Sequence, residues 1–146
     1  MWKESDSTGT SADPAVEAAE LAELFQELSE AVDEFRLDEQ IRHLTGRDQL
    51  VKLKFLGQKL DEQVGAFQTE ETVELLAVTQ PDLGRIKLLA VEAKVRIALL
   101  EDADRVIAIA VAGLSAGAAI VSGDAVLIES STHQFSLAVV FRPAVQ

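Results

Sequence analysis

Apolar residues recur every three or four positions through the first part of the chain, a spacing that predicts the buried face of a helix. This face comprises Leu21, Leu24, Phe25, Leu28, Val32 and Phe35. Asp13 and Pro14 precede it. We expect the helix to begin there, because aspartate caps a helix N-terminus and proline is tolerated at the first helical position. The phase of the pattern slips near Leu37, which predicts a break or a kink at that point.

A second helical pattern follows Thr45 and Gly46, which are typical of a helix end. Asp48 is placed to cap this second helix. Its apolar face comprises Leu53, Leu56, Leu60, Val64 and Phe67. Because each helix has one apolar face to bury, we expect the two helices to pair as a hairpin within residues 14–68.

The apolar period changes at about residue 72. In residues 91–97 apolar and charged residues alternate strictly, which places Glu92, Lys94 and Arg96 together on one face of a strand. Residues 72–79 are a possible strand before it, and the segment between the two contains Pro and Gly as a turn requires.

Three further strands are expected over residues 105–111, 118–121 and 125–129, with a tight turn at residues 122–124. A final strand is predicted to present four residues on one face: Phe135, Leu137, Val139 and Phe141. The second half of the chain therefore reads as a series of short strands joined by turns.

We predict an α+β fold in which the N-terminal helical hairpin of residues 14–68 is followed by an antiparallel β-meander over residues 72–142. Residues 1–13 are expected to form a flexible tail, and residues 14–146 a single domain. The alternative is a mostly α-helical bundle with a C-terminal β-hairpin, because residues 82–121 also fit the helical period and are rich in alanine.

Residues 86–98, with the sequence Ile-Lys-Leu-Leu-Ala-Val-Glu-Ala-Lys-Val-Arg-Ile-Ala, resemble the second shell strand of gas vesicle structural proteins. The resemblance extends over about a tenth of the chain. No function is transferred from it.

Charge and composition disfavour several classes of binding partner and of chemical site. A formal net charge of -12 disfavours direct binding to nucleic acid and to anionic membranes, because like charges repel. The absence of cysteine excludes disulfides and thiolate metal sites. The N-terminus lacks the apolar run of a cleaved secretory signal, so we expect a cytoplasmic location.

The apolar run from Val106 to Ile128 is long enough to cross a bilayer, and Gly113 and Gly117 within it form a GxxxG pattern. Asp124 opposes insertion, because a carboxylate within a membrane span is costly. We therefore expect a buried or interfacial layer of small residues in place of a membrane span.

No catalytic, cofactor-binding or metal-binding residue is predicted. Glu101, Asp102 and Asp104 indicate a solvated turn, since no longer ligand pattern follows them. Neither His43 nor His133 has a second histidine or a cysteine to complete a metal pair, and the glycines match no phosphate-binding motif. Whether the chain is an enzyme is uncertain, and the balance leans against it. Glu92, His133 and Asp124 are the residues to test for that possibility.

The leading functional hypothesis is a non-enzymatic structural or protein-interaction protein, expected to be a homo-oligomer, that self-associates through its small-residue, β-rich C-terminal half. The self-association candidates are Val106, Ala108, Ala110, Gly113, Gly117, Phe135, Leu137, Val139 and Phe141. An acidic docking face for a basic protein partner is predicted at Glu20, Glu23, Glu27, Glu30 and Glu34. The alternative is a binding module for a small apolar ligand or lipid.

Overall fold

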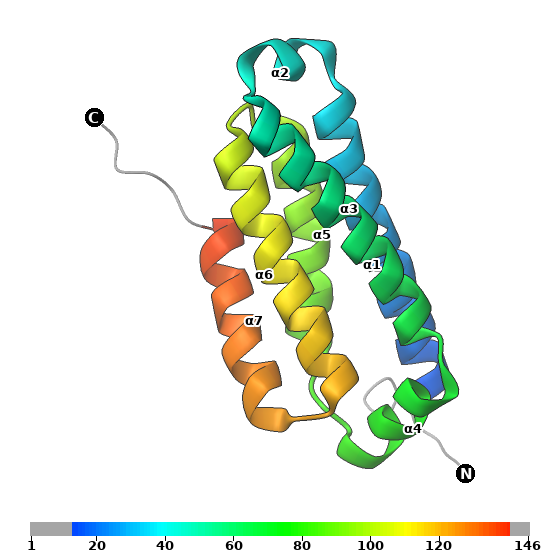
Figure 1. The fold of residues 1–146 in the computed structure, drawn as a ribbon. Helices are drawn as coiled ribbons and strands as arrows, with labels where there is room; N and C mark the ends of the chain where they lie inside the picture. The colour runs from blue at the N-terminus through cyan, green and yellow to red at the C-terminus, as the bar shows by residue number, and fades with distance from the viewer. Residues whose placement is uncertain (1–12, 141–146) are drawn as a thin grey trace.

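The described part of the chain, residues 13–140 of a computed structural model, consists of α-helices joined by short turns (Figure 1). The helices are α1 (Pro14–Leu37), α2 (Glu39–Leu44), α3 (Arg47–Phe67), α4 (Glu70–Thr79), α5 (Gly84–Leu99), α6 (Ala103–Ser122) and α7 (Ala125–Val140). Within these residues there is no strand.

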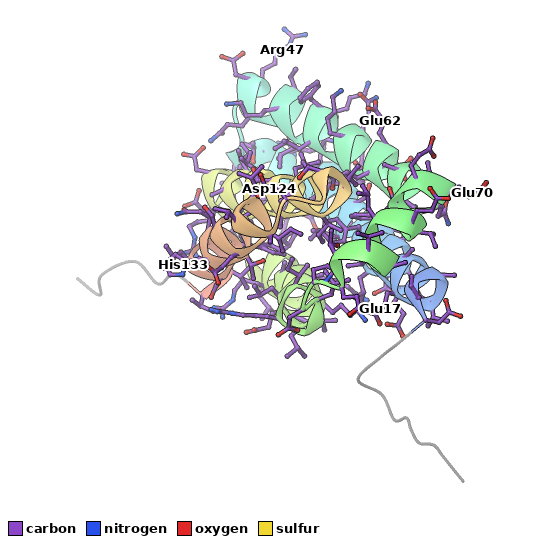
Figure 2. All side chains as sticks on the ribbon, turned by 90° about the horizontal axis from the view of Figure 1, so that it is seen from below. Glu17, Arg47, Glu62, Glu70, Asp124 and His133 are labelled. Carbon is purple, nitrogen blue, oxygen red and sulfur yellow. The ribbon has the colours of Figure 1, made fainter. Side chains whose placement is uncertain are left out.

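The five long helices form a bundle around one core. Their principal contacts run in the order α1, α3, α6, α7, α5 and back to α1, so each helix packs against two neighbours. The short helices α2 and α4 lie at opposite ends of the bundle (Figure 1). Phe25 of α1 and Phe67 of α3 meet edge to face in the core, with ring centroids 5.0 Å apart. Seen along the bundle from below, Glu62, Glu70 and His133 lie at its periphery (Figure 2).

The predicted N-terminal helices are confirmed. The Asp13 carboxylate accepts a hydrogen bond from the backbone N–H of Ala15 at 2.8 Å, and α1 ends at Leu37, where the apolar phase slips. The second long helix, α3, begins one residue before the predicted cap, with Gly46 as its N-cap. The two helices pack against each other as a hairpin, and the Ser29 hydroxyl of α1 donates a hydrogen bond to an α3 carbonyl at 2.9 Å.

The predicted β-meander over residues 72–142 is wrong, because residues 70–79 and 84–99 form α4 and α5. The strict alternation over residues 91–97 belongs to α5, so this segment differs from the strand of the proteins it resembles. Its buried residues follow helical spacing: Ile86, Leu89, Ala90, Ala93 and Ile97. The charges that alternation would gather on one face of a strand are distributed around the helix, as Lys94 turns toward α1 and pairs with Glu27.

The last predicted strands are also wrong within the described residues, since they form α6 and α7. The turn at residues 122–124 does exist, but it joins two helices. Gly123 adopts the left-handed conformation there, with φ of 74°, and Asp124 caps α7 by accepting the N–H of Val126 at 2.9 Å. The alternative prediction of a helical bundle fits the structure, whereas its C-terminal β-hairpin does not.

Small residues let α6 approach α3 closely. Gln63 of α3 donates a hydrogen bond from Nε2 to the Leu114 carbonyl of α6 at 2.7 Å. A Cβ atom on Gly117 would overlap the amide end of this glutamine side chain, so a larger residue there would displace the Gln63 amide from its place against α6. The alanine- and glycine-rich run therefore serves helix packing inside the bundle.

Candidate functional site

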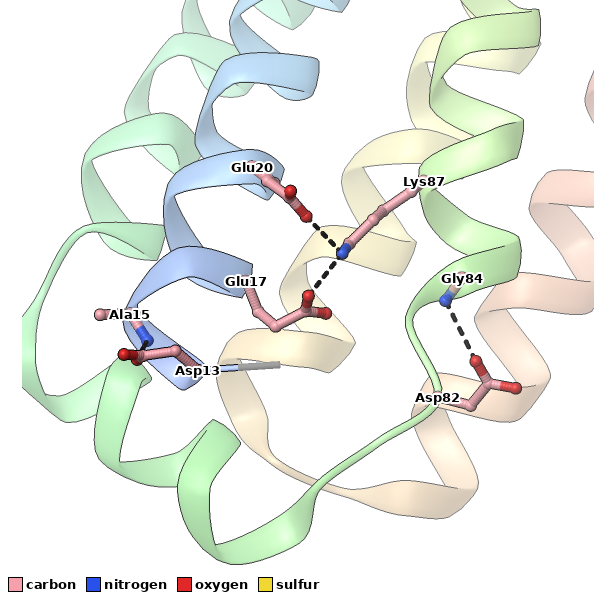
Figure 3. A network of polar contacts seen from close by, with 7 residues as sticks. All are labelled: Asp13, Ala15, Glu17, Glu20, Asp82, Gly84 and Lys87. Carbon is pink, nitrogen blue, oxygen red and sulfur yellow. Dashed lines mark hydrogen bonds and ion pairs between the residues drawn. The ribbon is translucent and has the colours of Figure 1, made fainter. Parts of the chain in front are cut away.

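The seam between α1 and α5 begins with a lysine held by two carboxylates. Lys87 Nζ lies 2.7 Å from Glu17 Oε2 and 2.6 Å from Glu20 Oε1 (Figure 3). Burial lowers the pKa of Lys87, but the hydrogen bonds and charges of the two glutamates outweigh burial and hold the pKa above its ordinary value of 10.5. The lysine is therefore a stable cation that ties the two helices together.

A second ion pair follows further along the same seam. Lys94 Nζ lies 3.0 Å from Glu27 Oε1. Lys87 and Lys94 are seven residues apart, as are Glu20 and Glu27, so both pairs join residues separated by 67 positions. The constant separation reflects two helices that run in the same direction side by side (Figure 1).

Beyond Lys94 the seam opens into a groove of about 820 Å³ between the C-terminal ends of α1 and α5, with α2 at its end. Its apolar lining comprises Ala31, Phe35, Ile41, Val95, Ile97, Ala98, Leu99 and Leu100. Phe35, Ile41 and Ile97 are buried, whereas the side chains of Val95 and Leu99 are 54% and 77% exposed and form a rim.

Carboxylates dominate the polar lining of this groove. They are Glu27, Glu30, Glu34, Asp38 and Glu101. Lys94 is the one cation among the lining residues, and it is already paired with Glu27. The groove therefore combines an apolar floor with a strongly negative frame, which favours a ligand that is both apolar and cationic.

The solvent face of α5 continues the apolar rim of the groove along the helix. Leu88, Val91, Val95 and Leu99 follow at helical spacing and are between 46% and 77% exposed. The opposite face of α5 is buried in the core. Two apolar faces on one helix are unusual for a surface element, and the outer one has no partner among the described residues.

The five predicted acidic docking residues occupy three different settings. Glu27, Glu30 and Glu34 line the groove, whereas Glu20 is engaged with Lys87 at the other end of the seam. Glu23 is exposed on α1 and does not line the groove.

Sequence reasoning missed Glu17, Lys87 and Lys94 as parts of this seam. The available signal was two lysines and two glutamates that share a spacing of seven, which matches ion-pairing between parallel helices. It also missed Glu101 and the apolar rim of α5 as parts of a groove.

The predicted β-rich self-association surface is wrong, because its residues lie on helices. Four of the α6 candidates, Val106, Ala110, Gly113 and Gly117, are buried inside the bundle, and Ala108 faces solvent. On α7, Phe135 and Val139 are buried, whereas Leu137 is 49% exposed. Phe141 lies outside the described residues.

Two of the acids that follow α5 make hydrogen bonds within the bundle, and the two histidines are exposed. Asp102 caps α6 by accepting the N–H of Asp104 at 3.0 Å, and Asp104 accepts a hydrogen bond from Gln49 Nε2 at 2.6 Å. His43 and His133 are exposed on different helices. No cluster of three or more potential metal ligands occurs within residues 13–140.

By length and composition alone, α6 is a helix that a bilayer would accommodate. In the bundle it packs between α3 and α7. A core helix of a water-exposed bundle has the same composition, so this property does not distinguish the two environments.

Comparison with known proteins identifies no relative: no protein-family model, no curated sequence and no solved structure matches this chain.

Proposed function

We propose that this protein is an interaction module that binds a basic, amphipathic helix of a partner protein in the groove between α1, α2 and α5. The observation that carries the proposal is the apolar floor enclosed by five carboxylates, with a single cation that is already paired. An amphipathic helix laid into a hydrophobic groove is a recurrent mode of peptide recognition.

The apolar residues define the shape of the ligand. Phe35 and Ile41 form a buried floor, and Val95 and Leu99 stand exposed at its edge. The same face continues to Leu88. A helix lying along α5 would cover this whole stripe, because its side chains repeat at the same spacing.

The charges define the chemistry of the ligand. Lysine or arginine residues flanking the apolar stripe of the partner would meet the groove carboxylates and speed its association. A second copy of this chain would bring a further net charge of -12, which opposes pairing. The charges therefore favour a basic partner over self-association, and homo-oligomerisation and a cytoplasmic location stay predictions from the sequence.

A synthetic peptide tests the proposal. The probe is a helix of about 18 residues with leucines along one face and lysines on both flanks, and the control peptide carries glutamate in place of each lysine. Fluorescence anisotropy of the labelled peptides at low salt measures binding. We expect the lysine peptide to bind with an affinity that falls as salt rises, and the glutamate peptide not to bind.

Two pairs of variants locate the binding. Glu30→Gln with Glu34→Gln removes groove carboxylates, and Glu74→Gln with Glu129→Gln removes the same charge from exposed positions on α4 and α7. We expect the groove pair to weaken binding about tenfold or more and the remote pair to weaken it no more than about twofold. Equal losses in both pairs would show non-specific attraction to an acidic protein and would contradict the proposal.

The small apolar ligand suggested as an alternative occupant gives a different result. Such a ligand would use Phe35 and Leu99 but not the carboxylates. If both peptides bound equally well, and if Glu30→Gln with Glu34→Gln left their binding unchanged, the occupant of the groove would be an apolar ligand and not a basic helix.

A further inference from the structure

The ion pairs between α1 and α5 form a ladder with a repeat of seven residues. Glu20 pairs with Lys87 and Glu27 pairs with Lys94, each across 67 positions. One repeat further in the sequence, the corresponding positions are Glu34 on α1 and Glu101, which follows the end of α5 and its extended C-cap residue Leu100. The third rung therefore carries a carboxylate on both sides, where each of the first two carries a carboxylate and an ammonium.

Both members of the third rung line the groove. Glu34 and Glu101 are exposed, and they share the cavity with Lys94 of the second rung. Within the described residues no ion pair joins α1 to α5 beyond Lys94, and this is where the seam opens. Two carboxylates that line one groove add their negative potentials there, which favours the binding of a cation.

We infer that the third rung, Glu34 with Glu101, is where a lysine or arginine of the partner helix binds, so that the partner supplies the cation that completes the α1–α5 ladder. The inference rests on the proposed function, and it deepens that function by naming the pair of residues that receives the partner's charge. The apolar floor at Phe35 and Leu99 holds the partner helix, and the third rung sets its position along the groove.

A local role for Glu101 is the competing explanation. Glu101 immediately precedes Asp102, the N-cap of α6, where a negative charge stabilises the helix dipole. A purely local role predicts that a positive charge at this position lowers thermal stability. The ladder predicts the reverse, because a lysine there would pair with Glu34 as Lys94 pairs with Glu27.

The first arm of the test is Glu101→Lys, with Glu129→Lys on α7 as the control of equal charge. We expect Glu101→Lys to raise the melting temperature, followed by circular dichroism, by about 1–3 °C. We also expect it to weaken binding of the lysine peptide by about tenfold or more. The control is expected to leave the melting temperature unchanged within about 1 °C and to weaken the peptide by no more than about twofold. A lower melting temperature in Glu101→Lys, or equal binding losses in the two variants, would overturn the inference.

The second arm locates the partner's charge. Each lysine of the peptide is replaced in turn by glutamine and measured against the natural chain and Glu101→Gln. We expect replacement of one particular lysine to weaken binding to the natural chain but to have little effect on binding to Glu101→Gln. This is the result that a double-mutant cycle gives for two residues in direct contact. Strictly additive losses at every lysine would overturn the inference. Failure of the natural chain to bind the lysine peptide at all would instead remove the proposed function itself.

Discussion

Lys87 shows how much a single side chain contributes when two carboxylates converge on it. Its ammonium bridges Glu17 and Glu20 of α1, and its side chain is only 21% exposed. Most surface ion pairs contribute little, because water screens them and long side chains lose rotamer freedom. Partial burial and two short contacts make Lys87 an exception along the seam (Figure 3).

Replacing Lys87 by methionine keeps the aliphatic stem and removes the charge. We expect the free energy of unfolding at pH 7 to fall by about 1–2 kcal/mol, because two charge-assisted hydrogen bonds are lost. The folded-state pKa is raised, so this stabilisation is fully present below pH 10.5 and is lost as pH rises through the higher folded-state value. Urea titrations of both proteins from pH 7 upward measure the difference.

Lys59→Met is the control for this prediction. Lys59 pairs with Glu62 at 3.4 Å on the surface of α3, where both side chains are more exposed. Its loss is expected to change the free energy of unfolding by about 0.5 kcal/mol or less. A similar loss in both variants, or a Lys87 contribution that persists at high pH, would contradict the role assigned to Lys87.

At the scale of the element, α5 has two apolar faces that do different work. The inner face packs into the bundle, where Ile86 and Leu89 are at most 4% exposed. The outer face carries Leu88 and Val91, which are 69% and 46% exposed. The isolated chain therefore gains stability from one face, and the other is available to a ligand.

Substitution on each face separates these contributions. Leu88→Gln with Val91→Gln is expected to change the free energy of unfolding by no more than about 0.5 kcal/mol and to weaken binding of the lysine peptide. The matched inner pair, Ile86→Gln with Leu89→Gln, is expected to cost more than about 4 kcal/mol, because buried amides lack partners there. Chemical denaturation measures both, and a large loss from the outer pair would mean that the outer face is already covered in the free protein.

At the scale of the whole molecule, α6 combines an apolar composition with a central place in the bundle. It packs between α3 and α7, and its buried residues include Val106, Ile109 and Ile120. Insertion of α6 into a bilayer would break these contacts and expose the apolar faces of its neighbours to water. The apolar surface of α6 can therefore contact either the other helices of the bundle or lipid, but not both.

Flotation with vesicles tests this competition. We expect the folded protein to stay in the dense fraction with vesicles of neutral phosphatidylcholine and with anionic vesicles, where its net charge of -12 adds repulsion. Helical circular dichroism of the unbound fraction confirms that the protein is folded. Flotation of the folded protein with neutral vesicles would contradict the assignment of α6 to the bundle core.

The sequence by itself determined the N-terminal helices and the acidic character of α1. Asp13, Pro14 and the phase slip at Leu37 act over a few residues, and helix caps and amphipathic spacing are local properties of the chain. The same local reasoning predicted an acidic docking face on α1, and three of its five glutamates line the groove.

Only the tertiary structure decided the second half of the chain and the groove. The alternation in residues 91–97 favoured a strand over the helical alternative, and the outcome depends on what packs against Ala93 and Ile97 and on which carboxylate meets Lys94. That carboxylate lies 67 residues away, and Glu101 and Glu34 line the same groove only because α1 and α5 pack side by side. The spacing of apolar residues and the pattern of charges depend on residues that are close in the sequence. A groove built from α1, α2 and α5 depends on residues that are far apart in the sequence and meet only in the folded protein.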